Sequence, residues 1–194
     1  LATGNEIVKP GDSLEHNQIV SSNALALAAL IHAHGGVPID LGIAPDDRAT
    51  LAKMADGARG ADMLITLGGA SVGDHDLVQS VLGEQGLEID FWRIAMRPGK
   101  PLMFGAIGET PMLGLPGNPV SSLICGLVFV SAAIHKLLGR GGDYLETDTA
   151  RLGCDLPAND ERQDYLRATL TRADDGALVA APFKQQESSM LTRL

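Results

Sequence analysis

A nearly continuous apolar run, Met63–Leu67, leads directly into a glycine-rich loop, Gly68–Gly73. Apolar residues without regular polar alternation are typical of a strand that is buried on both faces, as in parallel sheets. Helical patterns lie on both sides of this strand in the sequence, and alternating strands and helices predict right-handed crossovers. We therefore expect an α/β fold with a doubly wound, mostly parallel sheet.

Periodicity and capping signals place the remaining elements of the predicted fold. Helices are expected over 22–34, from 45–47 to 57–60, over 76–82 and from 119 to about 138, and strands over 37–41, 88–95, 102–106 and 112–115. The glycine-rich stretch 139–142 is the expected linker, and the predicted α/β domain spans residues 1–142. Beyond it, 164–172 and 177–183 flank an Asp-Gly turn and predict a hairpin. Residues 143–194 are thus expected to form a small, incomplete C-terminal β-domain.

The composition excludes several classes of function. The 194 residues include 15 Lys and Arg against 24 Asp and Glu, a net charge of −9, which disfavours a general nucleic-acid binder. The cysteines, Cys125 and Cys154, cannot form a disulfide framework or a zinc site, and they indicate free thiols in a reducing cytosol. The apolar stretch 120–134 is shorter than a membrane span, and no signal peptide is visible. The chain is therefore predicted to be cytoplasmic, with neither a nucleic-acid nor a membrane partner.

The glycine-rich loop is the first candidate binding site. Open α/β sheets bind ligands at the carboxyl ends of their strands, and glycines let backbone N–H groups approach an anion. Asp74 and Asp76 follow closely and could hold Mg²⁺ beside a phosphate, or one of them could only cap the next helix. The loop matches neither the dinucleotide fingerprint nor the P-loop. It does fit G-x-S-x-G over 69–73, so a hydrolase with Ser71 as nucleophile is a rival interpretation.

A local group of cations is the second candidate. Arg93, Arg97 and Lys100 lie close together, and residues 91–108 contain neither Asp nor Glu. Arginine forks and a lysine point charge suit an oxyanion, although a solvated basic turn would show the same pattern.

A rigid loop that leads into a helix is the third candidate. Within Leu115–Ser122, Asn118 and Pro119 are a specific helix start, and Ser121 lies in the first turn. Exposed N–H groups at that start favour an anion, and the alternative is a well-capped structural helix.

These segments together resemble a known family. GGASVGDHD (68–76), RPGKP (97–101) and LPGNPVSS (115–122) resemble the molybdopterin molybdenumtransferase family, which includes bacterial MoeA and the gephyrin E-domain. TGNE (3–6), NQIVSSN (17–23) and the loop at 45–47 resemble it too, in the same order along the chain. The tail segments 164–168 and 186–189 resemble the family's small C-terminal β-domain.

The resemblance implies a MogA-like molybdopterin-binding fold and a transferase. Its substrates would be adenylylated molybdopterin and molybdate, with Mg²⁺-dependent release of AMP; a homodimer and a MogA-like adenylyltransferase partner are implied as well. Combined with the motifs, it assigns catalytic roles to Asp46, Asp76, Arg93, Arg97 and Lys100. It assigns substrate binding to Thr3, Gly68, Gly69, Ser71, Gly73, Pro116, Pro119 and Ser121, and metal binding to Asp76, Asp74 and Glu6.

The chain also departs from the family pattern. Arg93 and Arg97 stand where members often have Lys, and Asn5 stands where many have Asp. Family members carry additional N-terminal domains and a cleft between protomers, so this chain alone is predicted to bind ligand weakly and to catalyse poorly. A MogA-like molybdopterin adenylyltransferase and a non-catalytic, gephyrin-like scaffold remain alternatives.

Overall fold

In the computed structural model, residues 1–69, 77–142, 145 and 147–189 are described. Their main sheet has six strands in the order β4-β1-β5-β9-β8-β6. The bounds are β4 (Ile43–Ala44), β1 (Ala2–Thr3), β5 (Leu64–Leu67), β9 (Thr110–Leu115), β8 (Met103–Ile107) and β6 (Leu87–Trp92). The first four strands are parallel, whereas β8 is antiparallel to both of its neighbours. The predicted α/β architecture with a mostly parallel sheet is confirmed.

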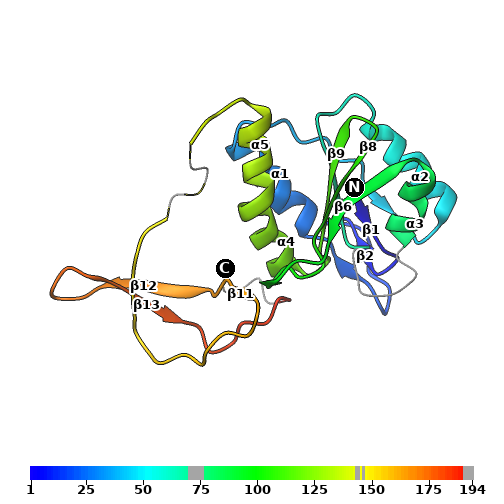
Figure 1. Cartoon of the computed structure of the whole chain (residues 1–194). Coiled ribbons are helices and arrows are strands. Elements are labelled where there is room, and N and C mark those ends of the chain that lie inside the picture. Colours follow the sequence, from blue (N-terminus) through cyan, green and yellow to red (C-terminus); the bar gives the residue numbers. More distant parts are fainter. Residues whose placement is uncertain (70–76, 143–144, 146, 190–194) are drawn as a thin grey trace.

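Helices cover both faces of this sheet (Figure 1). On one face α2 (Arg48–Ala55) and α3 (Leu77–Glu84) bury an apolar cluster that includes Leu51 and Leu82. On the other face α1 (Asn23–Ala33), α4 (Pro119–Cys125) and α5 (Ser131–Leu137) enclose a second cluster around Leu27 and Leu115. The two clusters explain why the central strands are apolar throughout: they are packed on both sides.

The long helix starts where the sequence predicts, at Asn118 and Pro119. A π-helical turn, Gly126–Val130, joins α4 to α5, and a Cβ atom at Gly126 would lie 2.7 Å from Leu27 Cδ2, so glycine permits the close approach of α1. The helix Pro119–Leu137 is long and apolar enough to cross a membrane by those two criteria alone. Its extent agrees with the helix predicted from 119 to about 138, and its buried side chains, among them Cys125, Val130 and Ile134, belong to the core beside the sheet.

Two predicted strands differ from the structure. Residues 37–41 do not form a strand; Asp40 instead accepts a hydrogen bond from the Gly42 N–H, and pairing with β1 begins only at Ile43. Val37 is 86% exposed, so the apolar pattern of this segment does not mark a buried strand. The strand expected over 88–95 ends at Trp92 because Arg93 has φ +67°, which breaks an extended strand.

The C-terminal residues contain the predicted hairpin, β12 (Ala168–Arg172) and β13 (Leu178–Pro182), which projects away from the main sheet (Figure 1). A third strand, β10 (Arg151–Leu152), lies parallel to β13. The residues before the hairpin pair elsewhere: β11 (Gln163–Asp164) adds to β7 (Met96–Arg97) of the larger domain. Two short strands, β2 (Ile7–Val8) and β3 (Ile19–Val20), and a 3₁₀ turn, Asp56–Ala58, complete the described elements.

Candidate functional site

A cavity of about 500 Å³ lies at the carboxyl ends of β1, β5 and β9. Six of the predicted site residues line it: Thr3, Glu6, Gly68, Gly69, Pro116 and Pro119. Residues that the sequence reasoning did not select also line it, among them Asn23, Pro101, Ser189 and the apolar Ile7, Ile19 and Val20. The position matches the rule that open α/β sheets bind ligands beyond the carboxyl ends of their strands.

Gly68 and Gly69, the described glycines of the loop, let it lie close to Thr3 of β1 and to Val78 of α3. A Cβ atom at Gly68 (φ +86°) would lie 2.9 Å from the carbonyl oxygen of Thr3. One at Gly69 (φ +66°) would lie 2.2 Å from Val78 Cγ2. The Gly68 N–H donates to the Leu115 carbonyl at 3.1 Å, which ties the loop to the end of β9. Ser71, Gly73, Asp74 and Asp76 lie outside the described residues, so their predicted roles stay predictions.

The loop before α4 is held from two sides. The Asn23 side chain donates to the Gly117 carbonyl at 2.7 Å, and the Asn118 side chain donates to Ser188 Oγ at 3.0 Å. Asn118 therefore holds the C-terminal tail and does not cap its own helix through its side chain. Ser121, predicted to bind substrate, is 95% buried and is not among the described residues that line the cavity.

A buried arginine shapes the tail that reaches this loop. Arg167 is 8% exposed, and its guanidinium donates to the carbonyls of Glu187 and Gln185 at 3.1 and 3.4 Å. Gln186 binds the backbone N–H and carbonyl of Arg167 through its side-chain amide. These bonds bring Ser189 to the cavity wall. The segment 186–189 was visible in the sequence only as a family resemblance.

The cationic segment, residues 93–102, forms a tight hairpin, which we call the cationic hairpin. The Arg93 N–H donates to the Leu102 carbonyl and the Ile94 N–H to the Lys100 carbonyl, both at 3.0 Å. The Arg93 guanidinium lies 4.1 Å from the centre of the Trp92 ring, a cation–π distance. Arg93 and Lys100 are exposed to solvent. Neither is among the cavity's described lining residues, but the adjoining Pro101 is.

Arg97 is not the free cation that the local sequence suggests. Its Nε and Nη2 donate to the two oxygens of Asp164, both at 2.8 Å, and Asp160 lies 3.7 Å from Nη1. The hydrogen bonds to Asp164 raise the pKa of Arg97, and Arg162 holds the pKa of Asp160 below its usual range. Both carboxylates are more than 60 residues away in sequence. The absence of Asp and Glu from 91–108 therefore does not make this surface purely positive.

Of the predicted metal-binding carboxylates, only Glu6 lies among the described residues, and Asp46, predicted to be catalytic, lies among them too. Asp46 accepts a hydrogen bond from the Asn5 N–H at 3.4 Å, and Asn5 Oδ1 accepts one from the Asp46 N–H at 3.1 Å. This exchange joins the loops after β1 and β4. The described residues contain no group of three His, Cys, Asp or Glu side chains that could hold a metal ion. The described residues by themselves therefore do not form a Mg²⁺ site, and the predicted ligands Asp74 and Asp76 lie outside them.

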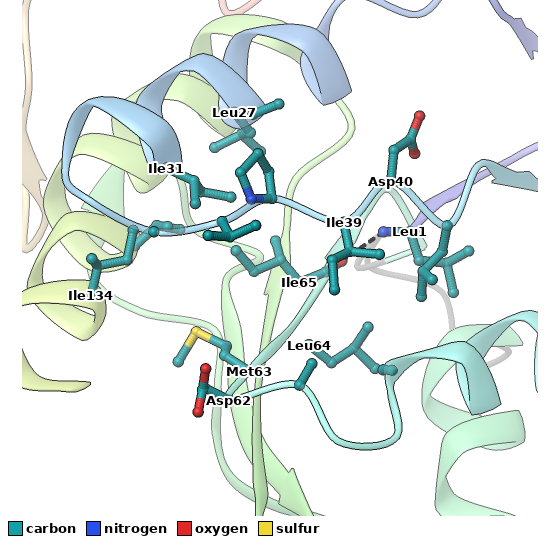
Figure 2. Close-up of a pocket in the computed structure, with 18 of the residues that line it drawn as sticks. Leu1, Leu27, Ile31, Ile39, Asp40, Asp62, Met63, Leu64, Ile65 and Ile134 are labelled. Atoms are coloured by element: carbon teal, nitrogen blue, oxygen red, sulfur yellow. Dashed lines mark hydrogen bonds between the residues drawn. The ribbon is translucent and has the colours of Figure 1, made fainter. Parts of the chain in front are cut away.

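A second cavity, of about 340 Å³, lies near the amino ends of β1 and β5 (Figure 2). Its walls are mostly apolar, with Leu27, Ile31 and Ile134 on one side, and the backbone nitrogen of Leu1 donates to the Ile65 carbonyl at 3.0 Å. Among its described lining residues the only charged side chains are acidic, Asp40 and Asp62. This cavity lies at the opposite end of the strands from the loop motifs, whereas Thr3, Gly68 and Pro116 line the first cavity, which is therefore the candidate functional site.

Comparison with known families gives two matches along the chain. Residues 1–136 match a family described as "Probable molybdopterin binding domain", and residues 149–194 match "MoeA C-terminal region (domain IV)". The molybdopterin molybdenumtransferase of Haemophilus influenzae is 40% identical over 141 residues, which is 72% of this chain and 35% of that protein. The chain belongs to the molybdopterin molybdenumtransferase family.

Other members of this family agree with that assignment. The molybdopterin molybdenumtransferase of Nostoc sp. is 37% identical over 180 residues, 90% of this chain and 41% of that protein. The molybdopterin biosynthesis MoeA protein of Pyrococcus horikoshii superposes with a TM-score of 0.78 at 34% identity, over 95% of this chain and 44% of that one. The chain thus spans less than half the length of these relatives.

Proposed function

We propose that this chain is the molybdopterin-binding and C-terminal part of a molybdopterin molybdenumtransferase that inserts molybdate into adenylylated molybdopterin and releases AMP. The observation that carries the proposal is the cavity at the carboxyl ends of β1, β5 and β9, which the motif residues Thr3, Gly68 and Pro116 line. Closely approaching backbone at glycines and a helix N-terminus suit anions, and molybdate and phosphate are both anions.

The C-terminal residues favour insertion over adenylylation. The match to the MoeA C-terminal region covers 149–194, and this part is bound to the larger domain through β11 and the tail. A MogA-like adenylyltransferase remains the nearest alternative because it would share the α/β domain. Detection of molybdate-dependent AMP release, without transfer of adenylate from ATP to molybdopterin, would separate the two.

Several finer features belong to the same proposal. We infer Mg²⁺ dependence from the family resemblance at Asp74, Asp76 and Glu6, and a cytoplasmic setting from two free thiols. A homodimer and a MogA-like partner are proposed on the same resemblance. Because relatives are more than twice as long, we expect full activity only from a complete polypeptide.

The decisive experiment is a cofactor reconstitution assay with the complete polypeptide. Adenylylated molybdopterin, molybdate and Mg²⁺ should yield AMP and a cofactor that activates a molybdenum-free apoenzyme. Lys100→Ala should lower the yield, whereas Lys136→Ala, an equally simple loss of one lysine on α5, should not. Equal activity of both variants would remove Lys100 from the site, and absence of molybdate-dependent AMP release would refute the proposed reaction.

A further inference from the structure

We propose that Asp164 is a positioning residue for the cationic hairpin: it orients Arg97 and thereby fixes the segment that carries Lys100 and Pro101 beside the cavity. This inference rests on the proposed function, since it assumes that the ligand is an anion. It differs from the assignments above, which give Asp164 no role in the site.

The contact has the geometry of an orienting bond. Arg97 and Asp164 meet edge to edge, with Nε–Oδ1 and Nη2–Oδ2 distances of 2.8 Å. Such a two-bonded pair fixes the plane of the guanidinium as well as its position. The Asp164 side chain is only 12% exposed, whereas Arg97 is 46% exposed, so the carboxylate is the anchored partner. Nη1 of Arg97 makes a looser ion pair, 3.7 Å from Asp160 Oδ2.

The backbone reinforces this anchor on both sides. The Gln163 N–H donates to the Ala95 carbonyl at 2.9 Å, and the Tyr165 N–H donates to the Arg97 carbonyl at 2.8 Å. Met96, between these two carbonyls, is 3% exposed and packs in the core. β11 thus holds residues 95–97 of the hairpin, and the chain turns through 98–100 to reach Pro101 on the cavity wall.

Two roles for Asp164 predict opposite effects on anion binding. A carboxylate that only neutralises Arg97 would weaken the attraction for molybdate, so Asp164→Asn would lower the KM for molybdate. A carboxylate that positions the hairpin would have the reverse effect. Asp164→Asn is nearly isosteric and removes the charge-assisted bonds, for which we expect a rise of about tenfold in the KM for molybdate.

The test uses the complete polypeptide and three further variants. Asp164→Glu should recover part of the loss. Asp164→Asn should have little further effect in an Arg97→Lys background, because lysine cannot form the two-bonded contact. Asp175→Asn is the matched control. It removes a carboxylate in the turn between β12 and β13, away from the cationic hairpin, that pairs with Arg151 at 3.1 Å, and both side chains are more than half exposed. It should leave the KM for molybdate unchanged.

A second readout does not depend on the reaction. Hydrogen exchange at the Ile94 amide, which donates to the Lys100 carbonyl, should accelerate in Asp164→Asn and not in Asp175→Asn. If the wild-type polypeptide inserts no molybdenum, the proposed function fails while this exchange result still decides the role of Asp164. Unchanged exchange, an unchanged or lowered KM, or a loss of kcat that merely follows a loss of folded protein would overturn the inference.

Discussion

The carbonyl oxygen of Ser188 accepts a hydrogen bond from the backbone N–H of Val120, with 2.9 Å between the two atoms. Val120 lies in the first turn of α4, where N–H groups have no partner within the helix. Asn118 adds a bond to the Ser188 hydroxyl. The C-terminal tail therefore occupies part of the helix N-terminus, and an anion there would share it with Ser188.

Removal of the Gln186 side chain should release this tail. Its amide donates to the carbonyls of Arg167 and Phe183, both at 2.9 Å, and accepts from the Arg167 N–H. We expect Gln186→Ala to destabilise the protein by ~1–3 kcal/mol, since partly buried polar groups lose their partners. The check is faster hydrogen exchange at the Val120 amide.

The control for this prediction is Gln163→Ala in the same C-terminal part. The Gln163 side chain makes an exposed bond to the Tyr165 hydroxyl, and its loss should leave exchange at Val120 unchanged. Equal exchange in both variants would mean that Gln186 does not hold the tail.

Substitution of Gly69 should be costlier than substitution of Gly60, a glycine that also has a positive φ but has open space around it. Both Gly69 and Gly60 have positive φ, which costs alanine ~1–2 kcal/mol. A Cβ at Gly69 would also overlap Val78 Cγ2 at 2.2 Å, whereas nothing lies within 4 Å at Gly60. Because Val78 is buried and stiff, Gly69→Ala should lose a further ~1–3 kcal/mol.

Urea unfolding of the two variants measures this difference directly. Gly69→Ala should also weaken molybdopterin binding under the proposed function, because the loop lines the cavity. A stability loss equal to that of Gly60→Ala would show that α3 yields freely to the added methyl group.

Local patterns predicted most of the α/β domain. The run Met63–Leu67 and the Asn118-Pro119 start lie within elements whose signals are short-range, and both match the structure. The strand predicted over 37–41 was wrong because an apolar pattern cannot show whether a partner strand lies alongside. In the structure the pairing with β1 starts only at Ile43. Arg93, with its positive φ, ended a strand that sequence extended to Ala95.

The site was harder to predict because its charges come from distant parts of the chain. Thr3, Gly68 and Pro116, which the motifs pointed to, line one cavity because the parallel strands before them end at the same edge of the sheet. No local pattern could pair Arg97 with Asp164, 67 residues away. The local sequence 91–108 does contain cations without any acidic residue, but tertiary packing places Asp164 and Asp160 against Arg97.

The bond from Asn23 to the Gly117 carbonyl should be required for the shape of the cavity. It spans 2.7 Å and joins the start of α1 to the loop before α4, and both residues line the cavity. Asn23→Ala should cost about 1 kcal/mol of stability. Asn23→Asp should be worse, because a carboxylate would face the carbonyl oxygen without a proton to share.

Thermal unfolding of the two Asn23 variants checks this order, and the difference should shrink at low pH, where the new carboxyl group is protonated. Asn17→Asp, an exposed asparagine on the preceding loop, supplies the charge control. If Asn23→Asp were as stable as Asn23→Ala at neutral pH, the Asn23–Gly117 bond would not be a stabilising link.

The two cysteines should differ sharply in reactivity and in their effect on stability at high pH. Burial raises the pKa of the Cys125 thiol to about 12, whereas Cys154 is exposed. At pH 8 a thiol reagent should therefore label Cys154 in the folded protein and both residues only after unfolding.

Between about pH 9 and pH 12 the unfolded Cys125 is ionised while the folded one keeps its proton. The folded state then binds more protons, so stability falls as the pH rises, by up to ~1.4 kcal/mol per pH unit. Denaturant unfolding from pH 8 to pH 11 should show a shallower decline in Cys125→Ala than in Cys154→Ser, and identical slopes would contradict the burial of an un-ionised thiol at Cys125.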